Sequence, residues 1–159
     1  MKICFCATKN LYYKLAIVIT SLLHYNPSIE TIYLIIEDDE WQYIKDKRIK
    51  IINIKKLELD ISESNPNLKR FCTYMSLMRA YLPLILSNED KIISSDCDIL
   101  FNGKLDEIWN WNLNNNYLAA VPEWGKSMEL GSSTWNFPYV NTGFILMDLK
   151  AMREKHIVD

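Results

Sequence analysis

The chain has 159 residues, of which 49% are hydrophobic and 24% are charged, with only four Gly and five Pro. This composition excludes the disordered and fibrous classes, and the length predicts one domain over residues 1–159 with a core of its own. Because the formal net charge is −2 and no basic patch stands out, we expect no nucleic-acid partner.

The cysteine pattern indicates a reducing compartment. No CxxC pair and no zinc-spaced His accompany the four cysteines, which are Cys4, Cys6, Cys72 and Cys97. Met1-Lys2 leads directly into an apolar run, so no signal peptide is expected. The longest apolar stretch, Leu15 to Leu23, is too short to span a bilayer. These features predict a cytoplasmic protein, either free or attached to a membrane surface.

The first part of the chain alternates strand and helix patterns. Lys2 to Ala7 is a compact strand, and the following Thr8-Lys9-Asn10 favours a turn or a helix cap. Tyr12 to Tyr25 has helical spacing, and Thr31 to Ile36 is almost wholly apolar, as buried parallel strands are. The acidic run Glu37 to Glu40 predicts the start of another helix, where carboxylates are favourable, with a metal role as the alternative.

The second part continues this alternation. Ile49 to Ile54 is a third strand, and Lys69 to Leu86 has helical spacing, with Pro83 opening a second short helix. The later expectations are a helix over 105–111, a strand over 117–121, a loop over 125–138 and a strand over 144–148. The repeated alternation predicts an α/β fold with a largely parallel sheet.

The most informative stretch is Lys91 to Phe101, an apolar strand that delivers Asp96 and Asp98 at its end. Ligands bind at the carboxyl ends of strands in open α/β sheets, and two ionised carboxylates are costly to bury without a cation. Carboxylate oxygens suit Mg²⁺ or Mn²⁺, which completes its shell with water and substrate phosphates. A diphosphate-bearing substrate is therefore one hypothesis, and a solvated Asp turn is the other.

Phosphohydrolases of the haloacid-dehalogenase type also carry a DxD motif after a strand. Their motif follows the first strand, however, and Leu100 stands where they usually have Thr or Val. We therefore disfavour this class.

Four stretches together resemble glycosyltransferase family 8, which includes glycogenin and lipopolysaccharide galactosyltransferases. They are Ala7 to Tyr12, Arg79 to Pro83, Lys91 to Phe101 and Tyr139 to Lys150. The resemblance implies a Rossmann-like nucleotide-diphospho-sugar transferase fold of glycosyltransferase type A. It also implies a metal-dependent retaining enzyme that transfers a hexose from a UDP-sugar to a hydroxyl of a glycan, lipopolysaccharide or similar carbohydrate or glycolipid acceptor.

The same resemblance implies roles for single residues. Asp96 and Asp98 would bind Mn²⁺ or Mg²⁺, and Cys97 between them would offer backbone contacts to the ribose. The residues that would hold the uracil and ribose are Ala7, Thr8 and Tyr12. Three plainer alternatives stay open: Cys97 as an indifferent small residue, Thr8 as a helix cap and Tyr12 as the first apolar residue of its helix.

A second group would contact the donor sugar: Arg79, Glu123, Asn141 and Thr142. Arg79 has a planar fork suited to phosphate or sugar oxygens, although a surface Arg on a helix would look the same. Glu123 stands where relatives carry Asp, and Asn141 with Thr142 could serve only as a turn cap.

The family's further metal-binding His and a carboxylate–amide turn have no counterpart before Asp159, and we expect neither His24 nor His156 to replace them. The chain thus resembles a family member without its C-terminal part. The alternative function is a catalytically incompetent nucleotide-sugar-binding domain. Four tryptophans could form an acceptor-binding surface or simply a core or interface: Trp109, Trp111, Trp124 and Trp135.

Overall fold

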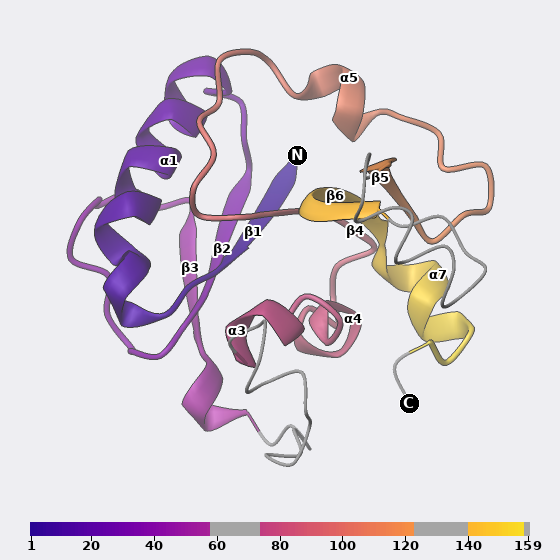
Figure 1. The fold of residues 1–159 in the computed structure, drawn as a ribbon, viewed down its shortest axis with the longest axis horizontal. Coiled ribbons are helices and arrows are strands. Elements are labelled where there is room, and N and C mark those ends of the chain that lie inside the picture. The colour runs from indigo at the N-terminus through magenta and orange to yellow at the C-terminus, as the bar shows by residue number, and fades with distance from the viewer. Residues whose placement is uncertain (58–73, 123–139, 158–159) are drawn as a thin grey trace.

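The computed structural model describes residues 1–57, 74–122 and 140–157. Six strands form one sheet in the order β3-β2-β1-β4-β6-β5 (Figure 1). Their bounds are Lys2–Cys6 for β1, Thr31–Ile36 for β2, Ile49–Asn53 for β3, Lys91–Ser95 for β4, Leu118–Pro122 for β5 and Val140–Asp148 for β6. Neighbouring strands pair in parallel from β3 to β4, whereas β6 is antiparallel to both β4 and β5. The predicted α/β fold with a mostly parallel sheet is confirmed.

The described helices are short except for the first. They are α1 Tyr12–Tyr25, α3 Tyr74–Leu77, α4 Leu82–Ile85, α5 Asp106–Trp109 and α7 Leu149–Glu154. Pro83 lies at the start of α4, as expected of a residue that needs no amide partner in a first helical turn. None of the helices in these ranges is long and apolar enough to cross a membrane.

Helices cover both faces of the sheet, which is why its central strands are apolar on both sides. Leu15, Ile19 and Leu22 of α1 pack on one face against Phe5 and Leu34. Met78 just after α3, Leu82 of α4 and Met152 of α7 pack on the other face around Ile35 and Ile92. Figure 1 shows α1 on one side of the strands and α3 with α4 on the other. The nearly continuous apolar run in β2 follows from this double burial.

The prediction of a helix that begins in the acidic run Glu37 to Glu40 is wrong, because residues 37–48 form irregular backbone with bends and one turn and contain no helix. Tertiary contacts replace the helical ones. The Glu37 carboxylate accepts hydrogen bonds from the Lys9 amide (3.1 Å) and the Tyr74 hydroxyl, and Lys56 lies 2.6 Å from Asp39. Side-chain partners on other elements thus fix this segment, and local sequence signals do not contain them.

β6 is longer than predicted, because it begins at Val140 and not at Phe144. The turn expected at Asn141 and Thr142 is therefore part of a strand. Its pairing with β5 shifts in register: Ala120 pairs with Ile145, whereas the next residue, Val121, pairs with Asn141. Residues 142–144 lie between these pairs as a bulge, a feature that bends a strand and redirects its side chains.

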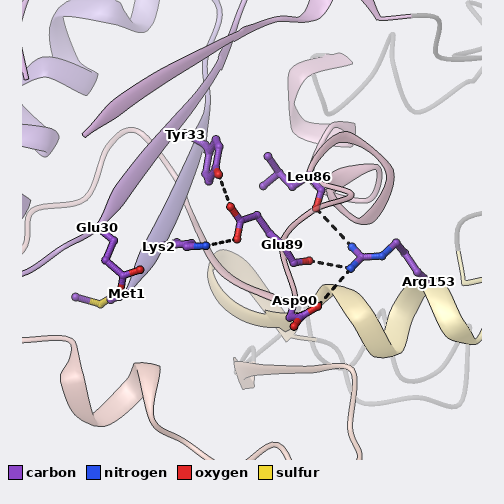
Figure 2. A network of polar contacts seen from close by, with 8 residues as sticks. All are labelled: Met1, Lys2, Glu30, Tyr33, Leu86, Glu89, Asp90 and Arg153. Carbon is purple, nitrogen blue, oxygen red and sulfur yellow. Dashed lines mark hydrogen bonds and ion pairs between the residues drawn. The ribbon is translucent and has the colours of Figure 1, made fainter. Parts of the chain in front are cut away.

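A polar network closes the end of the sheet where β1 and β4 begin (Figure 2). Glu89 is only 9% exposed, and its carboxylate accepts hydrogen bonds from Lys2 of β1 and from the Tyr33 hydroxyl of β2. Arg153 of α7 donates to the Glu89 carbonyl oxygen at 2.9 Å and to the Leu86 carbonyl oxygen at 3.5 Å. The network joins α7 to the chain before β4. It lies at the end of the sheet opposite to Asp96 and Asp98.

Candidate functional site

The strand order reverses between β1 and β4, which makes this pair the topological switch point of the sheet. From β1 the chain passes to β2 and β3 on one side, and β4 then lies against the other side of β1. In open α/β sheets a crevice forms at the carboxyl ends of the strands at such a switch point, and ligands bind there. Ala7 and Thr8 follow β1, and Asp96 to Asp98 follow β4, so the two central motifs meet at this crevice.

A cavity of about 210 Å³ lies at this junction. Five predicted site residues share its wall: Thr8, Arg79, Asp96, Cys97 and Asp98. The described lining also includes Lys14 on the first turn of α1, Met75 with Ser76 on α3, and Cys6 and Leu11, none of which was predicted as a site residue. Lys14 lies six residues after Thr8, in the first turn of a helix that begins beside the crevice. This position in the sequence could have indicated a basic side chain near the crevice.

Arg79 forms an ion pair with Asp96, the first carboxylate of the DxD motif. One guanidinium nitrogen donates to Asp96 Oδ1, and Nε donates to Ser94 Oγ at 3.1 Å. The Arg79 side chain is 15% exposed, whereas that of Asp96 is 45% exposed. The alternative of a solvated surface Arg is therefore wrong, and Asp96 keeps an open side toward the cavity.

Gly143 approaches the same carboxylate from β6. A Cβ atom at this position would lie 2.9 Å from Asp96 Oδ2 and 3.0 Å from Asn141 Oδ1, closer than side chains tolerate. The Asp96 amide donates to the Gly143 carbonyl oxygen at 2.7 Å, and the Gly143 amide donates to Asn141 Oδ1 at 2.8 Å. A Gly inside a strand often marks such an approach, so the sequence held a signal for this contact.

Cys97 is a packed thiol and not a reactive one. It is 6% exposed, and its Sγ donates to the Cys6 carbonyl oxygen at 3.4 Å. Burial first of all, with smaller contributions from Cys6, Asp96 and Asp98, raises the pKa of the Cys97 thiol to about 12, although Arg79 acts in the opposite direction. The thiol therefore stays protonated at neutral pH, as the predicted non-catalytic role requires.

The residues after β1 differ in their exposure to the crevice. Ala7 is buried, and its amide donates to the Ile35 carbonyl oxygen at 3.1 Å. Thr8 precedes the turn 9–11 in a capping position, but its hydroxyl donates to Asn10 Oδ1 instead of accepting from the backbone. Thr8 thus reaches the cavity without making the cap hydrogen bond.

Tyr12 lies in the core beside the crevice. It is 5% exposed, its hydroxyl accepts the Glu37 amide at 3.1 Å, and its ring meets Trp41 edge to face at 5.7 Å. This is the packing expected of the first apolar residue of α1. The ring also borders a neighbouring cavity of about 760 Å³ whose described lining includes Lys9, Asp38 and Tyr43.

The residues predicted for the donor sugar are only partly placed. Glu123 lies outside the described residues, as do Trp124, Trp135 and Cys72. Asn141 and Thr142 are exposed at and just before the bulge of β6, next to the Gly143 contact with Asp96. Both residues therefore lie at the same end of the sheet as the DxD motif.

The carboxylates of Asp96 and Asp98 suit a hard divalent cation, but two carboxylates do not fill its coordination shell. Within residues 1–57, 74–122 and 140–157 no group of three His, Cys, Asp or Glu side chains could hold a metal. His24 ends α1, and His156 follows α7, which starts at the other end of β6. In the part of the chain that the structure describes, Asp96 and Asp98 are the carboxylates at this cavity, and two carboxylates fit an ion that takes its other oxygens from water and phosphate.

Comparison with known proteins agrees with this arrangement. The family model for glycosyl transferase family 8 matches residues 2–159. The chain belongs to this family. Among its family 8 relatives, human glucoside xylosyltransferase 1 is 31% identical over 104 residues, which cover 60% of this chain and 24% of that protein. A putative glycosyltransferase of Haemophilus influenzae is 30% identical over 108 residues, covering 62% of this chain and 33% of that protein.

Solved glycosyltransferase structures share the fold. The galactosyltransferase LgtC, in complex with donor and acceptor sugar analogs, superposes with a TM-score of 0.75 at 19% identity, covering 97% of this chain and 60% of that one. Mouse xyloside xylosyltransferase 1 superposes with a TM-score of 0.61 at 16% identity, covering all of this chain and 72% of that one. The predicted type A glycosyltransferase fold is confirmed. This family 8 chain spans about a fifth to a third of the length of the curated relatives it matches.

Proposed function

We propose that this chain carries the donor site of a metal-dependent retaining glycosyltransferase that transfers a hexose from a UDP-sugar to a hydroxyl of a carbohydrate or glycolipid acceptor. The observation that carries the proposal is the meeting of Asp96, Asp98, Arg79 and Thr8 around one cavity at the switch point. Membership of family 8 and the names of its relatives support the transferase class. Retention at the anomeric carbon rests on the family resemblance.

Charge supports a metal ion together with a diphosphate. The described cavity wall has two cations, Lys14 and Arg79, and two carboxylates, Asp96 and Asp98, so their formal charges cancel. A divalent ion held by the two carboxylates would make the wall positive, which favours an anionic diphosphate. Bound Mn²⁺ or Mg²⁺ would supply Lewis-acid stabilisation of the departing nucleotide.

The chain's own residues then have distinct tasks. Arg79 pairs with Asp96 and lines the cavity, so its guanidinium would be available to a phosphate or sugar oxygen there. Ala7, Thr8 and Tyr12 border the place for the nucleoside, and Cys97 contributes backbone groups. We assign Glu123, Asn141 and Thr142 to the donor sugar.

We also propose that the protein works in the cytoplasm, either free or at a membrane surface. Among the described cysteines, Cys4, Cys6 and Cys97 are free thiols, which is the state that a reducing compartment maintains.

A nucleotide-sugar-binding domain without turnover is the second candidate. The two-carboxylate donor set among the described residues favours it, because two ligands hold a metal less firmly than three. Incubation with Mn²⁺ and UDP-glucose or UDP-galactose separates the two candidates. Release of UDP supports the transferase, and binding without release supports the domain.

The site itself is tested by calorimetry of UDP binding with and without Mn²⁺. Because Asp98→Asn removes a proposed metal ligand, we expect the Mn²⁺-dependent affinity to fall by more than the roughly 10–100-fold that loss of an outer-shell partner costs. Asp106→Asn on exposed α5 is the matched control and keeps the affinity. Unchanged affinity of the Asp98 variant removes the assigned role.

A further inference from the structure

A second cavity lies at the opposite end of β4 from the DxD motif. Its volume is about 700 Å³, within the range of small-molecule sites. Four segments contribute to its described lining: Lys91 at the start of β4, the loop 110–117 before β5, Asp148 at the end of β6, and the stretch from Ala151 of α7 to Lys155 just after it. The Asp148 amide donates to the Tyr117 carbonyl oxygen at 2.9 Å and joins the loop to the end of β6.

Trp111 presents an open aromatic ring on a fixed backbone in this cavity. The side chain is 63% exposed, which is unusual for the largest apolar residue type. Lys91 Nζ donates to the Trp111 carbonyl oxygen at 3.2 Å and lies 5.5 Å from the centroid of the Trp109 ring. The Trp111 amide donates to the Ile108 carbonyl oxygen at 3.1 Å. Because these contacts hold the backbone, a ligand that stacks on the indole would pay little ordering entropy.

Amide side chains line the same cavity as the Trp111 ring. Asn110, Asn112, Asn114 and Asn115 all line the cavity. Asn114 and Asn115 have φ values of 49° and 65°, and the Asn114 amide donates to Asn112 Oδ1 at 2.9 Å. Each Asn side chain offers both donors and an acceptor, so this loop can pair with hydroxyl groups in either direction.

The charges of the cavity point to a neutral ligand. Lys91 and Lys155 stand against Asp148 and Glu154, which gives two positive and two negative charges. Asp148 also caps α7 by accepting the Ala151 amide at 2.8 Å. An anionic ligand would meet no excess of positive charge among these residues. The 210 Å³ cavity at Asp96 and Asp98 differs, because a bound divalent ion would make its wall positive.

We infer that this cavity binds a short neutral oligosaccharide. The carbon–hydrogen face of a sugar ring would stack on Trp111, with Tyr117 as a second aromatic wall, and its hydroxyls would pair with the Asn amides. The site is separate from the donor site and does not depend on the proposed sugar transfer. If the chain does act as a transferase, a part of the acceptor remote from the reacting hydroxyl is the ligand that fits.

The test uses tryptophan fluorescence and calorimetry with maltotriose, cellotriose and xylotriose as neutral probes and with an acidic trisaccharide as comparison. We expect at least one neutral probe to bind and the acidic one to bind more weakly. Trp111→Ala should weaken the neutral probe by about tenfold or more, as the loss of an aromatic anchor does, and Trp111→Phe should restore most of the affinity.

Two controls separate this site from the rest of the molecule. Tyr13→Ala removes an aromatic ring of 56% exposure from α1 and should leave oligosaccharide binding unchanged. Trp111→Ala should keep Mn²⁺-dependent UDP binding, whereas Asp98→Asn should keep oligosaccharide binding. Absence of binding by all three neutral probes at millimolar concentration, or binding that Trp111→Ala leaves unchanged, would overturn the inference.

Discussion

Arg79 and Asp96 form an ion pair that joins the helical layer to the end of β4, and the same guanidinium donates to Ser94 Oγ at 3.1 Å. Lysine has a single ammonium group and cannot reproduce this fork. We therefore expect Arg79→Lys to lower Mn²⁺-dependent UDP affinity by about tenfold and the free energy of unfolding by about 1 kcal/mol. Calorimetry and urea denaturation measure the two effects.

Arg153→Lys provides the control for this change. Arg153 also donates to several acceptors, but these lie at the opposite end of β4. The control should lose stability and keep its UDP affinity. Equal losses of affinity in both variants would argue against a local role for Arg79.

Gly143 and Gly103 give a matched pair of substitutions. A Cβ atom on Gly143 meets Asp96 Oδ2 at 2.9 Å, whereas one on Gly103 meets nothing within 4 Å. Gly143→Ala should therefore displace the carboxylate, weaken Mn²⁺-dependent UDP binding and cost about 1–3 kcal/mol of stability through overpacking. Gly103→Ala should change neither by a measurable amount. Thermal unfolding with and without Mn²⁺ and UDP compares them.

Glu89 predicts a loss of stability in acid. Burial alone would raise its pKa, but the hydrogen bonds from Lys2 and Tyr33, together with the charges of Lys2 and Lys50, outweigh burial and lower the pKa below the usual 4.5. A carboxylate with a lowered pKa stabilises the fold above its unfolded-state pKa, and this contribution is lost as the pH falls through the folded-state pKa.

Glu89→Gln tests this contribution. At neutral pH we expect the variant to be less stable by about 1–3 kcal/mol, because Lys2 and Tyr33 lose a charged acceptor. The difference from the unmodified protein should shrink as the pH falls below 4.5. Asp90→Asn is the control, since its side chain is 78% exposed and lies 3.8 Å from Arg153. A constant difference between Glu89→Gln and the unmodified protein across this pH range would contradict the assignment.

The buried tyrosines predict a loss of stability in alkali. Burial raises the pKa of Tyr12 from 10.0 to about 12, although the Glu37 amide acts in the opposite direction, and burial with a carboxylate partner raises the pKa of Tyr33 and Tyr74 as well. A raised pKa stabilises the fold below the unfolded-state value of 10.0 and loses this effect as the pH rises through the folded-state value. Circular dichroism and phenolate absorbance followed together should show these tyrosines ionising with unfolding. Their ionisation in a folded protein would refute the prediction.

The alternation of patterns predicted the sheet class because strand and helix periods are local properties. The β2 run and the helix α1 were visible for this reason. The insertion of β6 between β4 and β5 was not, since strand order depends on contacts between residues far apart in the chain. The prediction for the segment after β2 was wrong for the same reason, because Tyr74 and Lys9, which lie on other elements, donate hydrogen bonds to Glu37.

The candidate site was predictable where a motif carries its own chemistry. Asp96 and Asp98 were found by their spacing after a strand, and Arg79 by its resemblance to a family motif. Gly143 and Lys14 were missed as site residues because their importance depends on the approach of another element. Which aromatic ring would be open to a ligand also required the fold, since Trp111 is exposed whereas Trp109 packs beneath Lys91.

β6 begins beside Asp96 and ends at the cavity of Trp111, and an extended strand cannot stretch. The five residue-to-residue steps from Gly143 to Asp148 thus set a separation of roughly 17 Å between the two places. One acceptor molecule that occupies both places must span this separation. The protein would then bind chains of several sugars more tightly than single sugars.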